Sequence, residues 1–335
     1  GNVNVKRDGV VQQWTNEQVA EYAKCMKNPA YFTTTYCKVI SLDDGLVPFD
    51  LYPYQEQMFK HFNENRFNIV LACRQSGKSI SSVAYLLWYA LFHSEKVIAV
   101  MANKGATARE MLGRITLMLE NLPFFLQPGC KALNKGSIEF SNNSRIIAAA
   151  TSGSSIRGMS VSLLYLDEFA FVENDAQFYT STYPVVSSGK STKVIITSTA
   201  NGIGNVFHKI WESALQGVSE FKPMRVDWWD VPGRDKAWQE ETIGNTSQLQ
   251  FDQEFGNTFF GTGDTLINGE TLLKLRAENY KLQREFGDLL IYEEPIKGHE
   301  YIMLCDVSKG RGQDYSTFNV IDISLRPFKQ VAVYR

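Results

Sequence analysis

The fold of this chain is decided by one stretch of its sequence, Ala72-Cys73-Arg74-Gln75-Ser76-Gly77-Lys78-Ser79. The apolar run Ile69-Val70-Leu71 precedes it, and an apolar, helix-forming run begins at Ile80. A strand, a turn and a helix in this order are typical of a phosphate-binding loop, in which backbone N–H groups at a helix N-terminus surround a phosphate. In such a loop Lys78 reaches the β- and γ-phosphates, and the Ser79 hydroxyl is a ligand for Mg²⁺.

Two positions of this loop depart from the usual pattern. Ala72 stands where glycine is common, so we expect its φ to be negative. Cys73 lies near the N-terminus of the predicted helix, a position that lowers the pKa of a thiol. We therefore expect bound nucleotide to slow the alkylation of Cys73.

Length and composition set limits on the class of protein. The chain has 335 residues, enough for two domains, and its net charge of −2 gives no global nucleic-acid-binding signature. Its five cysteines include no Cys-x-x-Cys pair, which favours reduced thiols in an intracellular protein. No apolar run is long enough to span a bilayer, so we expect a cytoplasmic protein with no membrane contact. The chain begins without Met and stops inside a predicted strand, so we expect a fragment.

Short apolar runs alternate with helical stretches from residue 68 onward. Strands are predicted at 69–72, 97–101, 145–149, 163–166 and 194–197, and helices after Lys78 and at 106–119. Apolar runs without polar alternation indicate strands buried on both faces, which predicts an α/β fold with a mostly parallel central sheet.

Four segments are predicted along the chain. Residues 1–45 form a helical N-terminal lead-in, with Thr15 as N-cap and a break at Asn28-Pro29. Residues 46–265 form the phosphate-loop domain, 266–299 a linker or lid subdomain, and 300–335 the start of another domain. Polar or amphipathic helices are predicted at 236–256 and 270–285.

A second motif is the apolar strand Leu163-Leu164-Tyr165-Leu166, which ends in Asp167-Glu168. Neighbouring strand residues point to opposite sides, so we expect the two acids to have different roles. Asp167 then holds Mg²⁺, and Glu168 accepts a proton from the attacking water. The alternative is a strand that merely ends in surface acids. Together with the phosphate loop, the pair predicts nucleotide hydrolysis.

Three further groups fit a nucleotide site, and each has an ordinary alternative. Gln55 suits an adenine edge, with Tyr52 or Tyr54 stacked on the base, or simply starts a helix. The hydroxyl-rich motif Thr197-Ser198-Thr199 can bond the γ-phosphate, the attacking water or the acidic pair, or forms a turn. Arg74 and Arg157 can stabilise the transferring phosphoryl group, or are surface or DNA-binding charges.

These residues together resemble the large terminase subunits of tailed phages, the T4 type above all. The resemblance covers nearly the whole chain from about residue 15. Its segments are Tyr54-Gln55, Cys73–Ser79, Asn134–Ile138, Ser155–Gly158, Tyr165–Phe171, Pro184–Gly189, Ile196–Gly202, Gln253-Glu254 and Asp306–Tyr315.

The resemblance implies a fold and a set of partners. It implies a RecA/ASCE-type P-loop NTPase that uses ATP and Mg²⁺ to drive double-stranded DNA into a prohead. In that family an arginine-bearing loop like Cys73–Gln75 is usual, and a motif like Thr197–Thr199 couples hydrolysis to DNA movement. The implied partners are the portal protein, the small terminase subunit and further copies in a ring, usually a pentamer, with a monomer in solution as an alternative. The implied location is the host cytoplasm, outside the mature virion.

The resemblance also implies a C-terminal nuclease of the ribonuclease H type, which uses two divalent metals, Mg²⁺ or Mn²⁺. Tyr301–Asp306 is its first strand, with Asp306 as a metal ligand, and Thr317–Asp322 is the next. Asp314 and Asp322 are interpreted as turn and strand-end residues. A single matching acid does not make a two-metal site, so we expect no nuclease activity from this chain.

Two other functions stay open at this point. A superfamily 2 helicase or translocase shares the glutamine, the phosphate loop, the acidic pair and a hydroxyl motif, but needs a second RecA-like domain after residue 250. A nucleotide-gated assembly protein binds ATP without coupled work, so DNA-stimulated turnover would distinguish it from a motor.

Overall fold

The structure of the chain is a computed structural model, which describes residues 2–152, 158–187, 189–260, 283–307 and 316–334. It divides into two units, Gly1–Gly263 and Asp264–Arg335. Among the described residues, no helix combines the length and the apolar character needed to cross a membrane.

An eight-stranded sheet forms the centre of the first unit, in the order β10-β3-β9-β8-β4-β7-β6-β5. The strands from β10 to β7 run parallel to one another. Strand β6 is antiparallel to β7, and β5 is antiparallel to β6. The bounds are β3 (Phe67–Ala72), β4 (Val97–Ala102), β5 (Cys130–Leu133), β6 (Ser137–Phe140), β7 (Arg145–Ala150), β8 (Leu163–Asp167), β9 (Lys193–Ser198) and β10 (Lys222–Val226). The five predicted strands and the mostly parallel sheet are confirmed.

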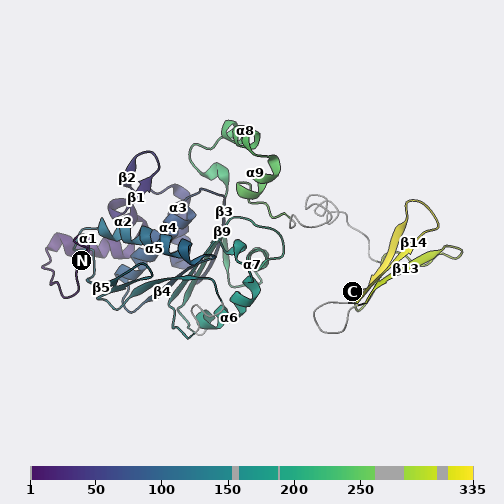
Figure 1. Cartoon of the computed structure of the whole chain (residues 1–335), viewed down its shortest axis with the longest axis horizontal. Helices are drawn as coiled ribbons and strands as arrows, with labels where there is room; N and C mark the ends of the chain where they lie inside the picture. Colours follow the sequence, from purple (N-terminus) through teal and green to yellow (C-terminus); the bar gives the residue numbers. More distant parts are fainter. Residues whose placement is uncertain (1, 153–157, 188, 261–282, 308–315, 335) are drawn as a thin grey trace. The chain divides into compact units, whose positions relative to one another are not determined.

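Helices cover both faces of this sheet because the central strands are apolar on both faces. Along β3, Val70 and Ala72 belong to one hydrophobic cluster, while Ile69 and Leu71 belong to the other. The first face packs against α1 (Asn16–Lys27), α2 (Pro29–Tyr36), α3 (Pro53–Glu64), α4 (Lys78–Phe92) and α5 (Gly105–Glu120). The second packs against η1 (Phe169–Phe171), α6 (Asp175–Ser187) and α7 (Val206–Leu215) (Figure 1). The result is a three-layer α/β domain.

The helical lead-in is part of this domain. The Thr15 side chain accepts a hydrogen bond from the Gln18 amide as the N-cap of α1, as predicted, and Asn28 separates α1 from α2. Cys25 and Phe32 are buried in the same cluster as α4. The hairpin β1 (Lys38–Ser41) and β2 (Gly45–Pro48) then leads to α3. The predicted segment 1–45 is therefore not a separate body in the structure, because Cys25, Phe32 and Cys37 are buried in one hydrophobic cluster with side chains of α4 and α5.

The predicted helical region 236–256 contains two helices, α8 (Lys236–Asn245) and α9 (Gln248–Glu254), after the short η2 (Trp228–Asp230). The helix is interrupted between them, and the Ser247 side chain caps the start of α9 by accepting a hydrogen bond from the Gln250 amide. The rings of Trp228, Trp238, Phe251 and Phe255 contact one another, with centroids 5.2–5.9 Å apart. We call these four side chains the aromatic cluster.

The second unit contains an antiparallel sheet in the order β11-β12-β15-β14-β13. Its strands are β11 (Arg284–Phe286), β12 (Leu289–Ile291), β13 (Tyr301–Asp306), β14 (Thr317–Asp322) and β15 (Lys329–Tyr334). The predicted linker 266–299 needs correction, because β11 and β12 are strands of this sheet. The helix predicted at 270–285 lies mostly outside the described residues, and its described end is part of β11.

Candidate functional site

The phosphate loop joins β3 to α4 at the carboxyl edge of the parallel sheet. Ala72 is the last residue of the extended strand β3, and its φ is not positive, as predicted. The loop residues with left-handed backbone angles are Gln75 (φ 56°) and Gly77 (φ 72°). A Cβ at Gly77 would lie 2.6 Å from Nε2 at the end of the Gln55 side chain, which would have to shift, and the positive φ of Gly77 is the stronger reason for glycine at this position. The first turn of α4 leaves backbone N–H groups without partners inside the helix, which is what a phosphate requires.

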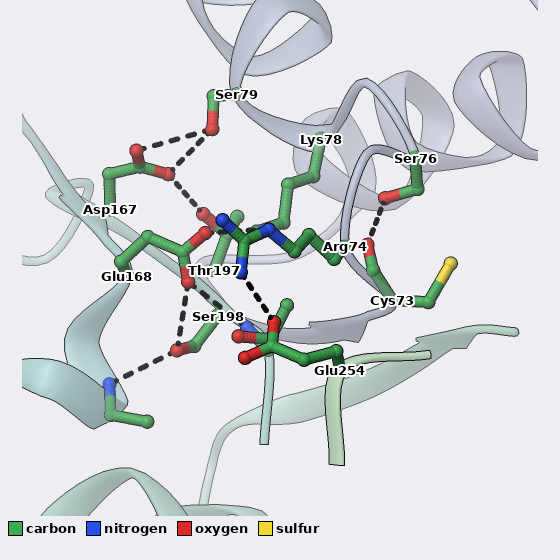
Figure 2. Close-up of polar contacts among 12 residues, drawn as sticks. Cys73, Arg74, Ser76, Lys78, Ser79, Asp167, Glu168, Thr197, Ser198 and Glu254 are labelled. Atoms are coloured by element: carbon green, nitrogen blue, oxygen red, sulfur yellow. Dashed lines mark hydrogen bonds and ion pairs between the residues drawn. The ribbon is translucent and has the colours of Figure 1, made fainter. Parts of the chain in front are cut away.

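Lys78 and Ser79 meet the two carboxylates of the second motif (Figure 2). Lys78 Nζ lies 2.7 Å from Glu168 Oε1, and the lysine side chain is only 6% exposed. The Ser79 hydroxyl donates to Asp167, with distances of 3.0 and 3.2 Å to the two carboxylate oxygens. The two motifs, predicted separately from the sequence, therefore form one site.

Asp167 is surrounded by hydrogen-bond donors in a buried position. Its Oδ1 also accepts from the Tyr165 hydroxyl at 2.7 Å and from Thr197 Oγ1 at 3.0 Å. Burial, followed by the nearby charge of Glu168, raises the pKa of Asp167. A buried carboxylate beside a serine hydroxyl matches the oxygen ligands that Mg²⁺ prefers, and a cation there would offset the cost of burying the charge. The oxygen atoms of Ser79 and Asp167 therefore fit a magnesium ion.

Glu168 departs from the expectation that the two acids point to opposite sides. It follows the end of β8 and has left-handed backbone angles, φ 48° and ψ 46°. Strand alternation therefore does not apply to it, and its side chain turns toward Lys78. Glu168 Oε2 accepts weakly from Ser198 Oγ at 3.4 Å and from the Thr199 amide at 3.2 Å.

The hydroxyl motif touches both carboxylates because its strand lies between theirs and the phosphate loop. Strand β9 pairs with β3 on one side and β8 on the other. Thr197 is fully buried and bonds Asp167, while Ser198 Oγ accepts from the Ala170 amide at 3.1 Å. Thr197, Ser198 and Thr199 thus connect the acidic pair to the start of η1.

Arg74 lies at the open side of the site. Its Nη1 is 3.1 Å from Glu254 Oε2, and its backbone amide donates to the Glu254 carbonyl at 2.7 Å. A cavity of about 260 Å³ is lined by Arg74, Glu168, Phe171, Thr199 and Glu254. The other candidate arginine, Arg157, lies outside the described residues.

Gln55 occupies the start of α3. Its Oε1 accepts from the Tyr52 amide at 2.9 Å, which is the ordinary helix-start role left open by the sequence. The neighbouring Tyr54 hydroxyl donates to the Ser76 carbonyl at 2.6 Å, so this tyrosine supports the phosphate loop. A contact of Gln55 with adenine stays a prediction.

The expectation of a low pKa for Cys73 is wrong. The side chain is fully buried and points away from the acidic pair (Figure 2), and burial raises the pKa of its thiol. The desolvation of the thiolate outweighs the nearby positive charges of Arg234 and Lys78.

Tyr165, Arg234 and Glu254 contact the site but were not among the predicted site residues. Tyr165 stands two positions before Asp167, so strand alternation could have placed both on one face. Its buried hydroxyl links Asp167 to Thr197, 2.9 Å away. Arg234 donates to the loop from a distant Pro-Gly-Arg-Asp turn, and nothing in the local sequence indicates that contact.

Asp306 ends β13 in the second unit and is exposed. Among the described residues, no group of three or more His, Cys, Asp or Glu side chains is arranged to hold a metal ion. Asp314 lies outside the described residues, and Asp322 ends β14 as predicted. The described part of the second unit therefore forms no such group around Asp306.

Comparisons with known proteins give the family. The family described as "Terminase large subunit, T4likevirus-type, N-terminal" matches residues 69–274, more than half of the chain. This chain is a member of that family. The match includes the phosphate loop, the acidic pair and the hydroxyl motif, whereas Tyr54-Gln55 and Asp306–Tyr315 of the resemblance lie outside it.

Individual large terminases share only low sequence identity with this chain. The large terminase subunit of Thermus virus P23-45 is 25% identical over 182 residues, which span 50% of this chain and 36% of that relative. The HK97 bacteriophage large terminase has a TM-score of 0.62 at 15% identity, covering 92% of this chain and 67% of that one. The large terminase of a thermophilic bacteriophage, solved in complex with ATP-γ-S, has a TM-score of 0.51 at 12% identity, covering 82% and 64%. These structures share the terminase fold.

Proposed function

We propose that this chain is the ATPase motor part of a viral DNA-packaging terminase, which couples Mg-ATP hydrolysis to translocation of double-stranded DNA into a prohead. The observation that carries the proposal is the meeting of Lys78, Ser79, Asp167 and Glu168 at one sheet edge. Membership of the large terminase family and the thermophilic phage terminase solved with ATP-γ-S support ATP as the substrate.

Each residue of the site has a proposed role. Backbone amides from Cys73 to Ser79 surround the phosphates, and Gln55 contacts the adenine. Ser79 and Asp167 hold Mg²⁺, which neutralises charge on the β- and γ-phosphates. Phosphate oxygens compete with Glu168 for Lys78, so substrate binding releases the Glu168 carboxylate to accept a proton from water.

The remaining candidates act on the phosphoryl group or transmit its loss. Arg74 and Arg157 are the proposed sources of positive charge for the transferring phosphoryl group. Arg74 must first exchange Glu254 for phosphate, because its guanidinium pairs with that carboxylate. Thr197, Ser198 and Thr199 couple hydrolysis to movement, since they contact the acidic pair and η1 together.

The partners follow from the proposed packaging role. They are double-stranded DNA, the portal protein, the small terminase subunit and further copies of the chain in a pentameric ring. The work takes place in the host cytoplasm, and the protein is absent from the mature virion. The full-length nuclease would use Asp306 and two divalent metals, Mg²⁺ or Mn²⁺, with acids that the described residues do not bring together.

A helicase is less well supported. A second RecA-like domain requires a parallel sheet, whereas the described strands of the second unit are antiparallel. The family match favours the packaging enzyme as well.

The test compares Glu168→Gln and Asp167→Ala with the wild type in nucleotide binding and turnover. We expect Glu168→Gln to bind ATP while turnover falls by about 10²–10⁴-fold, because it removes only the base. Asp167→Ala should weaken binding in the presence of Mg²⁺ and leave metal-free binding unchanged. Normal turnover in Glu168→Gln, or equal Mg²⁺ dependence in Asp167→Ala and the wild type, would contradict the assignments. Stimulation of turnover by DNA distinguishes a motor from a nucleotide-gated assembly protein.

A further inference from the structure

The back of the phosphate loop is held by Arg234, which lies between η2 and α8. Arg234 Nη1 donates to the carbonyl oxygen of Arg74 at 3.1 Å, and Nη2 donates to that of Gln75 at 3.1 Å. Its Nη1 also lies 3.5 Å from Cys73 Sγ. One guanidinium thus contacts three consecutive residues of the loop.

The aromatic cluster fixes the orientation of this guanidinium. The Cζ atom of Arg234 lies 4.7 Å from the centroid of the Trp238 ring and 5.3 Å from that of Phe255. These two rings meet edge to face, with centroids 5.2 Å apart. Packing against aromatic faces limits the freedom of an arginine, so less entropy is lost when it donates hydrogen bonds.

The other carbonyl groups of the loop have donors of their own. Cys73 O accepts from Ser76 Oγ at 2.8 Å, and Ser76 O accepts from the Tyr54 hydroxyl at 2.6 Å. Gly77 O accepts from the Ser81 amide at 3.0 Å. Arg234 supplies the two carbonyls between these, including that of Gln75, whose left-handed backbone is unfavourable for a residue with a side chain.

The peptide units that Arg234 contacts also carry N–H groups that face the other way. The Arg74 carbonyl shares its peptide unit with the Gln75 N–H, and the Gln75 carbonyl shares its unit with the Ser76 N–H. A charged donor on a carbonyl polarises the amide, so its N–H becomes a stronger donor. Because C=O and N–H point in opposite directions in a trans peptide, the guanidinium lies on the side of the loop away from the phosphate.

We propose that Arg234 is a positioning residue for nucleotide binding, which orients and polarises the Gln75 and Ser76 amides toward the β-phosphate. The inference rests on the proposed function, because it requires a nucleotide in the loop. Arg234 acts through the backbone that surrounds the β-phosphate, which ATP and ADP share. Its loss therefore weakens both nucleotides equally, whereas loss of a group that contacts the γ-phosphate weakens ATP alone.

The test measures ADP and ATP-γ-S binding by calorimetry, in the presence of Mg²⁺, for the wild type, Arg234→Met and Arg234→Lys. Methionine keeps an apolar chain against the rings and removes the donors, so we expect affinity for both nucleotides to fall about 10- to 100-fold. Lysine keeps the charge and should restore part of this loss. Arg225→Ala is the control, because Arg225 pairs with Asp227 and bonds the Gly256 carbonyl, away from the loop.

The outcomes separate this inference from the proposed function. Unchanged affinity in Arg234→Met overturns the inference, and so does a loss confined to ATP-γ-S. A fall in the number of binding sites without a change in affinity also overturns it, because that result indicates unfolding alone. If Arg234→Met does not fold, Arg234→Lys decides, and wild-type affinity for both nucleotides in that variant overturns the inference. If the wild type binds neither nucleotide, the proposed function fails first.

Discussion

The parallel sheet of the first unit and the antiparallel sheet of the second each carry an aspartate at the end of a strand, with opposite surroundings. Asp167, at the end of β8, is 4% exposed and accepts from Ser79, Tyr165 and Thr197. Asp306, at the end of β13, is exposed. Both were candidate metal ligands in the sequence.

Strand direction explains much of the difference. In a parallel sheet the carboxyl ends of neighbouring strands lie at one edge, so β3, β8 and β9 deliver their terminal residues to the same place. In the antiparallel pair, Asp306 stands opposite Thr317, the first residue of β14. An acid at a strand end becomes part of a site only where other elements bring partners to that end.

The largest expected effect in this comparison concerns two cysteines. Cys73 is fully buried and burial raises the pKa of its thiol, whereas Cys305 on β13 is exposed. Labelling of a buried thiol requires local opening, so we expect iodoacetamide to modify Cys305 at least about 100-fold faster. Peptide mass spectrometry over time measures both rates, and the denatured chain is the control. Bound nucleotide should slow Cys73 further. Similar rates in the folded protein would mean that the loop is open.

A smaller effect is expected for Tyr165→Phe, which removes one donor from Asp167 together with the contact between the Tyr165 hydroxyl and Thr197. Partners that orient a metal ligand contribute to metal affinity, so we expect about tenfold more Mg²⁺ for half-maximal ATP turnover. Tyr85→Phe is the matched control, because the buried Tyr85 hydroxyl has no hydrogen-bond partner among the described residues. An equal Mg²⁺ requirement in both variants would show that Tyr165 does not support Asp167.

The smallest effect is expected for Asp306→Asn. An exposed substitution away from a site changes the stability of a fold by about 0.5 kcal/mol or less, so melting temperature and ATP turnover should match the wild type. Cleavage of plasmid DNA with Mn²⁺ should be absent for both proteins. Cleavage by the wild type that Asp306→Asn abolishes would instead reveal a working metal site in the second unit.

Local sequence patterns predicted the central elements of the first unit well. The buried strands and the phosphate loop follow from apolar runs and turn residues close in the chain. Contacts that depend on distant segments were not predictable in this way. Arg234 donates hydrogen bonds to Arg74 and Gln75, which lie about 160 residues earlier in the chain. Strand β11 belongs to a sheet whose other strands all come later in the chain.

Conformation at single residues limited the prediction of the site. Strand alternation placed Glu168 opposite Asp167, but the left-handed backbone at Glu168 ends the strand and redirects its carboxylate to Lys78. The expected low pKa of the Cys73 thiol was wrong for a related reason. The helix N-terminus was visible in the sequence, while the desolvation that raises the pKa of the thiol depends on the burial of Cys73 in a cluster built from distant segments.

The backbone at Glu168 also bears on how such an enzyme could be stabilised. Left-handed angles favour glycine or asparagine, so glutamate at φ 48° carries a conformational cost. An engineer who optimised each position for its backbone alone would replace Glu168 with glycine or asparagine and relieve this conformational cost. The same change would leave the nearly buried Lys78 without its carboxylate partner and would remove the proposed base, so the backbone preference at this residue conflicts with both the ion pair and turnover.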